Sequence, residues 1–167
     1  RMEGMESIEQ RAFAEIQVGA CAPLVRPLEP QGIQLFAIMS GDVNPAHVDP
    51  EYAKSSMFQE VIAHGMWGGA LISTVLGTQF PGPGTIYIDQ TLHFSRPVGL
   101  GDTITVTLTA TRKFDHNHHI LFDCVCTNQD GQKVIGGTAE VLAPTEKIKR
   151  PRIELPEVTI VDREARY

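Results

Sequence analysis

This sequence is poor in cysteine, in basic charge and in long apolar runs, and each shortage disfavours a class of protein. Its three cysteines are odd in number and form no CxxC pair. Cys124 and Cys126 fall on the same side of an expected strand, where a mutual disulfide has awkward geometry. A disulfide-stapled secreted domain is therefore disfavoured, and we expect a reducing, cytoplasmic compartment.

Acidic residues outnumber basic ones, and the formal net charge is -6. A nucleic-acid module needs a basic face, so we expect no nucleic-acid partner. No apolar run is long enough to span a bilayer, and the N-terminal residues lack the apolar stretch of a signal peptide, so we expect no membrane partner. The composition, with 42% hydrophobic and 20% charged residues in 167, is that of one ordinary globular domain.

The first half of the chain carries helical signals. Residues 30–39 predict a short helix, and the pairs Asn44–Pro45 and Asp49–Pro50 each read as a helix cap followed by proline at the first helical position. Residues 64–79 are apolar nearly all round and end before a PGPG breaker, which predicts one buried helix. Its glycines lower helix propensity, so we expect another part of the chain or a ligand to approach its backbone closely.

From residue 86 onward the apolar period changes to two, which predicts four strands with one apolar and one wet face. The connectors between them are short and turn-like, so we expect antiparallel pairing. The residues expected on the apolar face are Ile86, Ile88, Leu92, Phe94, Ile104, Val106, Leu108, Ala110, Ile120, Phe122, Cys124, Cys126, Ile135, Ala139 and Val141.

These elements predict an α+β architecture, because the apolar helix can bury itself only by lying across the apolar face of the sheet. An earlier strand within residues 19–28 is expected to extend that sheet. Residues 144–167 contain three prolines and mixed charge. We therefore expect residues 1–143 to form the domain and residues 144–167 to form an extended tail or linker.

The stretch SGDVNPAHVD at residues 40–49 holds the candidate chemistry. Asp42 and His47 could share one water molecule as an acid–base pair, with apolar residues before them burying the carboxylate. Alternatively, Asp42 and Asn44 form turns and caps while His47 lies at the surface. A metal site formed by His47, Asp49 and His64 is a third option, but no compact ligand motif is present, so we predict no metal.

The start of the buried helix is a second candidate feature. His64 and Gly65 open it, and the unpaired N–H groups at a helix start attract a developing negative oxygen. Gly65 would let a carbonyl group approach closely, although a simple entry turn explains the same residues. Ser73 is either a core hydroxyl or a hydrogen-bonding group in a pocket. The HNHH stretch at residues 116–119 is expected at an exposed hairpin tip.

Three blocks together resemble the MaoC-like, R-specific enoyl-CoA hydratase (hydratase 2) family. FAIMSGDVNPAHVDPEYA at residues 36–53 is similar to its signature, in which an aromatic residue precedes S/T-G-D-x-N-P-x-H-x-D/E. VIAHGMWGGALIS at residues 61–73 and the stretch at residues 81–106 resemble the blocks that follow. The resemblance covers residues 10–143, and Ala46 stands where a larger aliphatic residue is common.

The resemblance implies a hot-dog fold, an antiparallel sheet wrapped around a long central helix, in a homodimer or higher homo-oligomer. It implies hydration of trans-2-enoyl-CoA to (R)-3-hydroxyacyl-CoA, reversible as a dehydration, with Asp42 and His47 as the catalytic pair. Gly65 then holds the thioester oxygen, Ser73 lines the site and Asn44 shapes the loop. No cofactor is implied, because coenzyme A is part of the substrate. Some relatives are fused to an acyltransferase domain.

Two other functions stay open on the sequence. A hot-dog acyl-CoA thioesterase is disfavoured, because such enzymes usually lack the paired Asp42 and His47 in this loop. A non-catalytic acyl-CoA-binding or assembly module could keep the motif without turnover. The basic residues that would meet the phosphates of coenzyme A are not identified by any motif, and Arg96 and Arg112 are only candidates.

Overall fold

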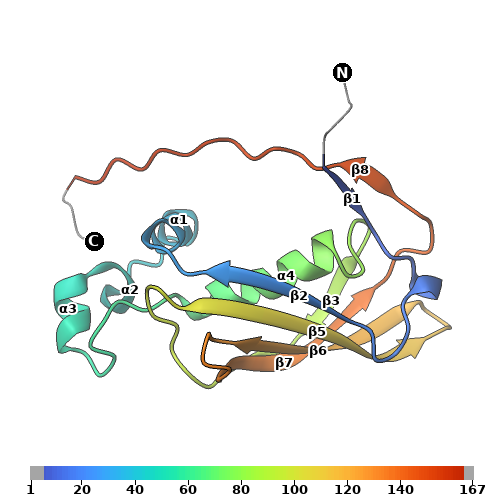
Figure 1. Cartoon of the computed structure of the whole chain (residues 1–167), viewed down its shortest axis with the longest axis horizontal. Coiled ribbons are helices and arrows are strands. Elements are labelled where there is room, and N and C mark those ends of the chain that lie inside the picture. The colour runs from blue at the N-terminus through green and yellow to red at the C-terminus, as the bar shows by residue number, and fades with distance from the viewer. Residues whose placement is uncertain (1–5, 164–167) are drawn as a thin grey trace.

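The computed structural model describes residues 6–163, in which six strands form one antiparallel sheet around a central helix (Figure 1). The strands pair in the order β2-β5-β6-β7-β3, and β4 also pairs with β7. Their bounds are Cys21–Pro27 for β2, Ile86–Gln90 for β3, His93–Phe94 for β4, Thr103–Phe114 for β5, His119–Thr127 for β6 and Lys133–Leu142 for β7. The predicted strands, the earlier strand in residues 19–28 and the antiparallel pairing are confirmed.

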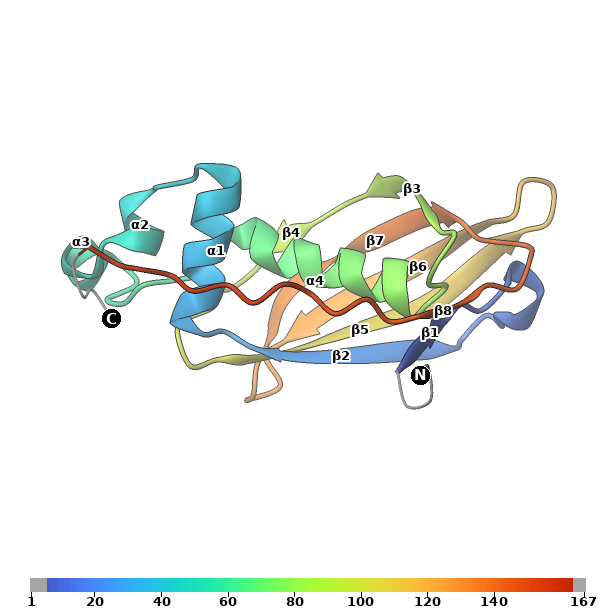
Figure 2. The same ribbon diagram turned by 90° about the horizontal axis from the view of Figure 1, so that it is seen from above.

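The buried helix is α4, Gly65–Thr78, and it lies along the concave face of the sheet (Figure 2). Ile72, Val75 and Leu76 are almost completely buried against strand residues such as Leu108 and Phe122. Burial of a fully apolar side chain contributes about 1.5–3 kcal/mol, so this one helix supplies much of the hydrophobic stabilisation. The prediction that the helix hides across the apolar face of the sheet is confirmed.

Three short helices gather at one end of α4: α1 (Pro30–Ser40), α2 (Pro45–Val48) and α3 (Pro50–Ser55). Asn44 caps α2 by accepting from the N–H of Ala46, and Asp49 caps α3 by accepting from two N–H groups. Each cap is followed by proline at the first helical position, as the sequence predicts. These caps give the loop between α1 and α2 a fixed shape.

The strand pair at the edge of the sheet departs from the prediction. Ile86, Ile88 and Phe94 were expected on a buried face, but they are 55%, 47% and 48% exposed. The pairing of β3 with β7 shifts register between Tyr87 and Asp89, and within residues 6–163 β3 has a strand neighbour on one side only. An edge strand with a bulge is twisted away from the core, so period-two apolar residues no longer mark a buried face there.

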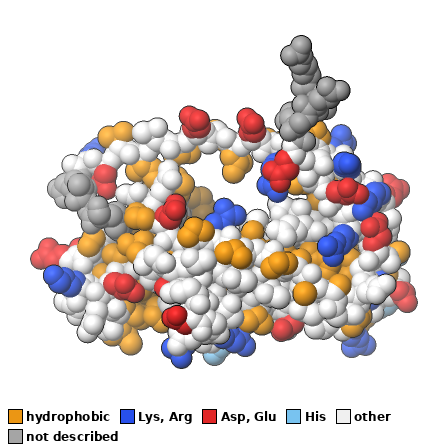
Figure 3. Space-filling model, in the orientation of Figure 1, with side chains coloured by type: hydrophobic (Ala, Val, Ile, Leu, Met, Phe, Trp, Pro, Cys, Tyr) orange, Lys and Arg blue, Asp and Glu red, His pale blue; other side chains and the backbone are white. Residues whose placement is uncertain are grey.

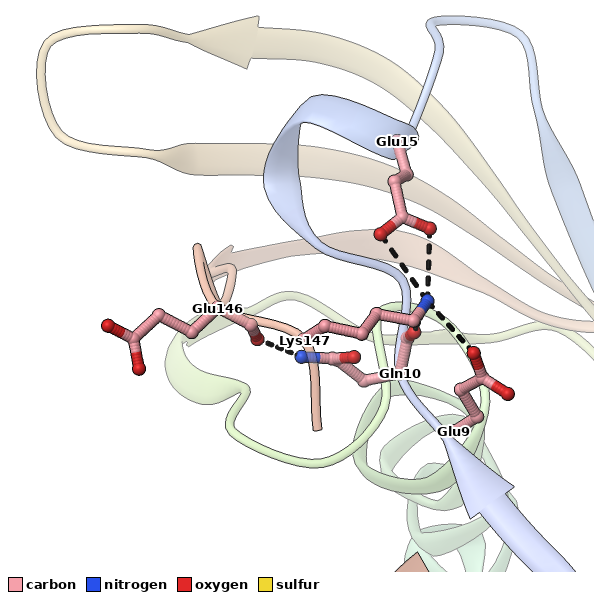
Figure 4. A network of polar contacts seen from close by, with 5 residues as sticks. All are labelled: Glu9, Gln10, Glu15, Glu146 and Lys147. Atoms are coloured by element: carbon pink, nitrogen blue, oxygen red, sulfur yellow. Dashed lines mark hydrogen bonds and ion pairs between the residues drawn. The ribbon is translucent and has the colours of Figure 1, made fainter. Parts of the chain in front are cut away.

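The residues before β2 and after β7 pair with each other. Strand β1 (Ser7–Glu9) pairs with β8 (Lys149–Pro151), and Lys147 lies in a polar network with Glu9, Gln10 and Glu15 (Figure 4). From β8 the chain runs extended above α4 toward α1 (Figure 2). A gap separates it from the body of the molecule over part of this course (Figure 3). The division of the chain at residue 143 stays a prediction.

The far end of this extended segment contacts α1 again. Gln31 donates to the carbonyl of Val158 at 3.4 Å, and Gln34 donates to the carboxylate of Asp162 at 3.2 Å. Within residues 6–163, no helix combines the length and the apolar character needed to cross a lipid bilayer.

Candidate functional site

The loop that carries Asp42 begins where α1 ends. Gly41 has a φ of 76°, the left-handed conformation that commonly ends a helix, and it turns the chain sharply. One carboxylate oxygen of Asp42 accepts from the N–H of Asn44 at 3.1 Å. The side chain of Asn44 accepts in turn from the N–H of Ala46 at 3.1 Å. The turn-and-cap interpretation of these two residues is therefore confirmed, and it is compatible with a catalytic role for Asp42.

His47 lies on α2, the helix that follows, and its ring is oriented by a backbone carbonyl. Its Nδ1 is 2.8 Å from the carbonyl oxygen of Ile62. Because a carbonyl oxygen only accepts, Nδ1 carries the proton in the neutral ring, and Nε2 is the nitrogen that accepts protons. The backbone of the same residue, Ile62, donates to the carbonyl of Ala46 at 3.2 Å. His47 is therefore half-buried and held, and the surface alternative is wrong.

Asp42, His47 and His64 converge on one point. A ligand atom from each of the three lies within 4.8 Å of the others. In a tetrahedral zinc site with bonds of about 2.0–2.2 Å, donor atoms lie roughly 3.4 Å apart, so a divalent cation would require these side chains to move closer. Asp49, expected as a ligand in the metal alternative, instead caps α3. The absence of a metal stays a prediction.

The expected burial of Asp42 is wrong for this chain. Its side chain is exposed, and Ile38 and Met39 near the end of α1 are exposed as well. These two residues lie in the last turn of α1, and their exposed side chains provide no apolar burial. Asp42 therefore meets the bulk solvent that supplies water, while His47 beside it is partly enclosed.

The first cavity, here called the His47 cavity, has a volume of about 420 Å³ and reaches from His47 to Gly65. Gly65 is the first residue of α4, so its N–H has no partner within the helix. A Cβ atom at position 65 would lie 3.0 Å from the ring of Phe94, so a larger residue would push this ring aside. The residues lining the cavity are His47, Met57, Phe58, Ile62, Ala63, His64, Gly65, Trp67, Gly68, Phe94, Ser95, Arg96, Pro97, Val98 and Ile135.

Ser73 is not brought into the His47 cavity. It lines a second cavity of about 570 Å³, here called the Ser73 cavity, on the side of α4 that faces β3. Burial raises the pKa of Tyr87 in this cavity to about 12, and the nearby Cys124 adds to the shift, so its hydroxyl stays protonated. The residues lining it are Phe36, Met39, Met66, Gly69, Ala70, Ser73, Tyr87, Ile88, Asp89, Gln90 and Leu92.

The structure places the two basic candidates, Arg96 and Arg112, in different parts of the molecule. Arg96 lines the His47 cavity, where a positive charge could meet a phosphate group. Arg112 lies over the ring of Phe114, near the opposite end of the long strand β5. The histidines expected at a hairpin tip do lie at the turn between β5 and β6, with His119 paired to Glu140 at 3.2 Å.

Sequence reasoning missed Phe94 and gave His64 only a place in a metal site or a helix entry. Phe94 was expected in the core, but it lines the His47 cavity and lies next to Gly65. His64 is buried, and its Nε2 donates to the backbone carbonyl of Asp42 at 3.0 Å. The signal for His64 was a polar residue directly before an apolar helix, but its partner lies 22 residues earlier.

Comparison with known proteins places this arrangement in a family. The model of the MaoC like domain matches residues 13–125. An (R)-specific enoyl-CoA hydratase of Rhodospirillum rubrum is 44% identical over 79% of this chain and 91% of its own length. A 3-hydroxybutyryl-CoA dehydratase of Methylorubrum extorquens is 34% identical over 83% of this chain and 88% of its own length.

A solved structure, the R-hydratase PhaJ1 from Pseudomonas aeruginosa in the unliganded form, superposes with a TM-score of 0.90 and 43% identity. The match covers 93% of this chain and 100% of that one. The (R)-hydratase from A. caviae involved in PHA biosynthesis has a TM-score of 0.75 and 34% identity, covering 77% of this chain and 98% of its own. These neighbours confirm the predicted hot-dog fold. The chain belongs to the family of the MaoC-like domain.

Proposed function

We propose that this chain is an enzyme that hydrates trans-2-enoyl-CoA to (R)-3-hydroxyacyl-CoA and catalyses the reverse dehydration. The observation that carries the proposal is the convergence of Asp42 and His47 beside a cavity that reaches the N-terminus of α4. Family membership supports it, because relatives at 44% and 34% identity are named (R)-specific enoyl-CoA hydratases. No cofactor is needed, since coenzyme A belongs to the substrate.

The reaction places one water molecule between the carboxylate of Asp42 and Nε2 of His47. One of the two groups accepts a proton as the water oxygen forms a bond to C3, and a proton is delivered to C2. Both parts of the water thus end in the product. The proton on Nδ1 of His47, held by the carbonyl of Ile62, keeps Nε2 able to accept. Positioned acid–base groups of this kind contribute about 10²–10⁴-fold in rate.

Negative charge builds on the thioester oxygen while water adds. The N–H of Gly65 at the start of α4 is suited to bind this oxygen, because the helix dipole and the absence of an intrahelical partner both favour an anion there. The ring of Phe94 lies next to Gly65 and lines the same cavity. In this proposal Arg96 faces a phosphate of coenzyme A from the rim of the His47 cavity.

Crotonyl-CoA tests the reaction class directly. The enoyl thioester absorbance and the release of thiol are followed together. Loss of absorbance without thiol release, giving the R product on chiral analysis, is the expected result. Thiol release would identify a thioesterase instead, and binding of the acyl-CoA without either change would identify a non-catalytic module.

Two variants with matched controls test the residues. Asp42→Asn and His47→Gln should each lower kcat by about 10²-fold or more while the melting temperature stays close to that of the unmodified protein. Asp115→Asn and His116→Gln make the same chemical changes at the hairpin tip and should keep full activity. If Asp42→Asn hydrates crotonyl-CoA as fast as its control, Asp42 is not part of the mechanism.

The same proposal includes a homodimer formed at the edge of the sheet. In the part of the chain that the structure describes, β3 has a strand neighbour on one side only, and Ile86, Ile88 and Phe94 present exposed apolar surface beside that edge. An unpaired strand edge with apolar side chains is stabilised by pairing with another strand. The dimer would close the open side of the Ser73 cavity, which Ile88 lines.

Light scattering coupled to size-exclusion chromatography tests this assembly. The expected mass at micromolar concentration is twice 18.3 kDa. Ile88→Lys should give a monomer, because a charge would be buried at the edge. Ile153→Lys, on the exposed tail, is the control. A monomeric unmodified protein would overturn the dimer without affecting the proposed chemistry.

The unpaired thiols of Cys21, Cys124 and Cys126 support a reducing, cytoplasmic location as part of this proposal.

A further inference from the structure

His64 occupies the N-cap of α4 without acting as a cap. Its side chain makes no hydrogen bond to the first N–H groups of the helix, although serine, threonine or aspartate in this position would do so. The residue is 3% exposed, and its Nδ1 has no hydrogen-bond partner among residues 6–163. Burying a polar ring in this way costs stability, so the ring has to be explained by what else it contacts.

Two contacts of the His64 side chain lead to the loop that carries Asp42 and to His47. Its Nε2 is 3.0 Å from the backbone carbonyl of Asp42, and the carbonyl only accepts, so Nε2 carries the proton. Its ring is stacked on that of His47, with 4.2 Å between centroids and 30° between planes. It also contacts Phe36 of α1, with centroids 4.8 Å apart. One buried side chain therefore touches the residue with the carboxylate and the ring of the imidazole.

The segment around His64 is itself fixed. The N–H of Ala63 donates to the carbonyl of Val98 at 2.7 Å, and Ile62 forms a bridge with Gly99. Ile62 also accepts from Nδ1 of His47. Residues 62–64 thus connect the loop to the sheet. Ile62 fixes the rotation of the His47 ring, and His64 fixes the position of Asp42.

We propose that His64 is a positioning residue of the hydration site, because its ring both anchors the Asp42 carbonyl and supports the plane of His47. The inference rests on the proposed function for its catalytic consequence. Each of the two contacts is needed for a different reason. The hydrogen bond from His64 to the Asp42 carbonyl fixes the carboxylate relative to the cavity. The stacking of the two rings stops the His47 ring from turning about its hydrogen bond to the carbonyl of Ile62.

Two substitutions separate these contacts. His64→Phe keeps an aromatic ring for stacking but cannot donate to the carbonyl of Asp42. His64→Gln keeps a donor at nearly the place of Nε2 but removes the ring. Because misplacing a catalytic group by 1 Å costs about 10²-fold, His64→Phe should lower kcat by about that factor with little change in KM. His64→Gln should retain more activity, with a loss of roughly tenfold, because the donor is conserved.

The controls are His116→Phe and His116→Gln at the hairpin tip, which should leave kcat unchanged. If His64→Phe keeps kcat within about twofold of its control, the positioning role is overturned. If both variants lose kcat equally and KM rises as kcat falls, His64 shapes the substrate site and does not position Asp42 and His47. The proposal fails in that case as well.

A measurement on the ring of His47 keeps the inference independent of activity and of any one variant. Long-range ¹⁵N–¹H correlation spectra report which ring nitrogen carries the proton. In the unmodified protein His47 should be protonated at Nδ1 and His64 at Nε2, and His64→Gln should change the His47 ring shifts because the stacked ring is gone. Unchanged His47 signals would overturn the proposal. An unmodified protein that is inactive on enoyl-CoA but gives the expected spectra would overturn the proposed function alone.

Discussion

Gly137 on β7 is a position where one added methyl group should distort the edge of the sheet that borders both cavities. A Cβ atom there would lie 1.9 Å from the carbonyl oxygen of Thr91 and 2.8 Å from its carbonyl carbon. These are backbone atoms, so no side-chain rotation relieves the clash. Thr91 is also tied to Thr138, donating to its carbonyl at 2.8 Å and accepting from its N–H at 2.9 Å. Gly137→Ala therefore has to displace the connection between β3 and β4.

Gly136, the preceding residue, is a matched control. A Cβ atom there would meet only the end of the Lys133 side chain, at 2.4 Å from Cε and 2.7 Å from Nζ, and that chain can move aside. Gly136→Ala should stabilise the protein by up to about 1 kcal/mol through the unfolded state. Gly137→Ala should destabilise it by about 1–3 kcal/mol through overpacking. A difference of about 3 kcal/mol corresponds to roughly 6–12 °C in melting temperature for a chain of this size.

The assay is thermal unfolding by circular dichroism at one fixed protein concentration, because assembly makes the melting temperature depend on concentration. Hydration of crotonyl-CoA should fall with Gly137→Ala as well, since displacing β4 moves Phe94 away from Gly65. If the two alanine variants melt within about 1 °C of each other, the carbonyl of Thr91 is able to yield and the argument is wrong.

Three further predictions follow from other parts of the structure. Burial raises the pKa of Cys124 to about 11 and that of Cys126 to about 12, from an ordinary value of 9.0. Below pH 9 both states keep these protons, and above it the unfolded chain releases them first, so the free energy of unfolding in urea should fall from pH 9 toward pH 12. Replacing both cysteines by alanine should flatten that slope, and an unchanged slope would contradict the assignment. Lys147→Met removes the ion pairs to Glu9 and Glu15, so trypsin should cleave after Arg152 faster than in the control Lys54→Met, with nearly the same melting temperature. Ser73→Ala should change KM for longer acyl chains more than kcat on crotonyl-CoA, because Ser73 lines a different cavity from His47; a large loss of kcat on crotonyl-CoA would place Ser73 with the reacting atoms instead.

The sequence predicted the parts of the site that are local. The cap at Asn44, the proline after it and the turn at Asp42 involve atoms within three residues of one another, so their geometry follows from residue types. The burial of α4 followed from its composition, because a helix that is apolar nearly all round has to be covered. The packing of α4 across one face of an antiparallel sheet followed from the need to bury an apolar helix. The hot-dog fold itself was implied by the resemblance of residues 36–53 and 61–73 to the MaoC-like family.

Features that depend on position in the sheet were not predictable in the same way. The residues of β3 have the same period-two pattern as those of β5, but β5 has strands on both sides and β3 lies at the edge. Which strand lies at the edge depends on pairings between distant residues. The contact between His64 and the Asp42 carbonyl is likewise set by the fold. The division of the lining residues between two cavities depends on which side of α4 each residue faces. The fusion of some relatives to an acyltransferase domain stays a prediction.

The glycines of α4 connect the local sequence signals with the long-range arrangement of the sheet. Glycine in a helix costs about 1 kcal/mol relative to alanine, so the sequence of this helix conflicts with its own structure. A Cβ atom added at position 69 would lie 3.1 Å from Met66 of the same helix. Added Cβ atoms would also meet neighbours from outside the helix: Phe94 at 3.0 Å from position 65, Ile135 at 2.2 Å from position 68, and Leu92 at 3.2 Å from position 69. These neighbours come from β7 and from the β3–β4 edge, and each lines one of the two cavities. The glycines, unfavourable as they are for the helix, thus let the edge of the sheet approach the first turns of α4, where the thioester oxygen is proposed to bind. Such a conflict between local helix propensity and the observed structure is expected at a functional site.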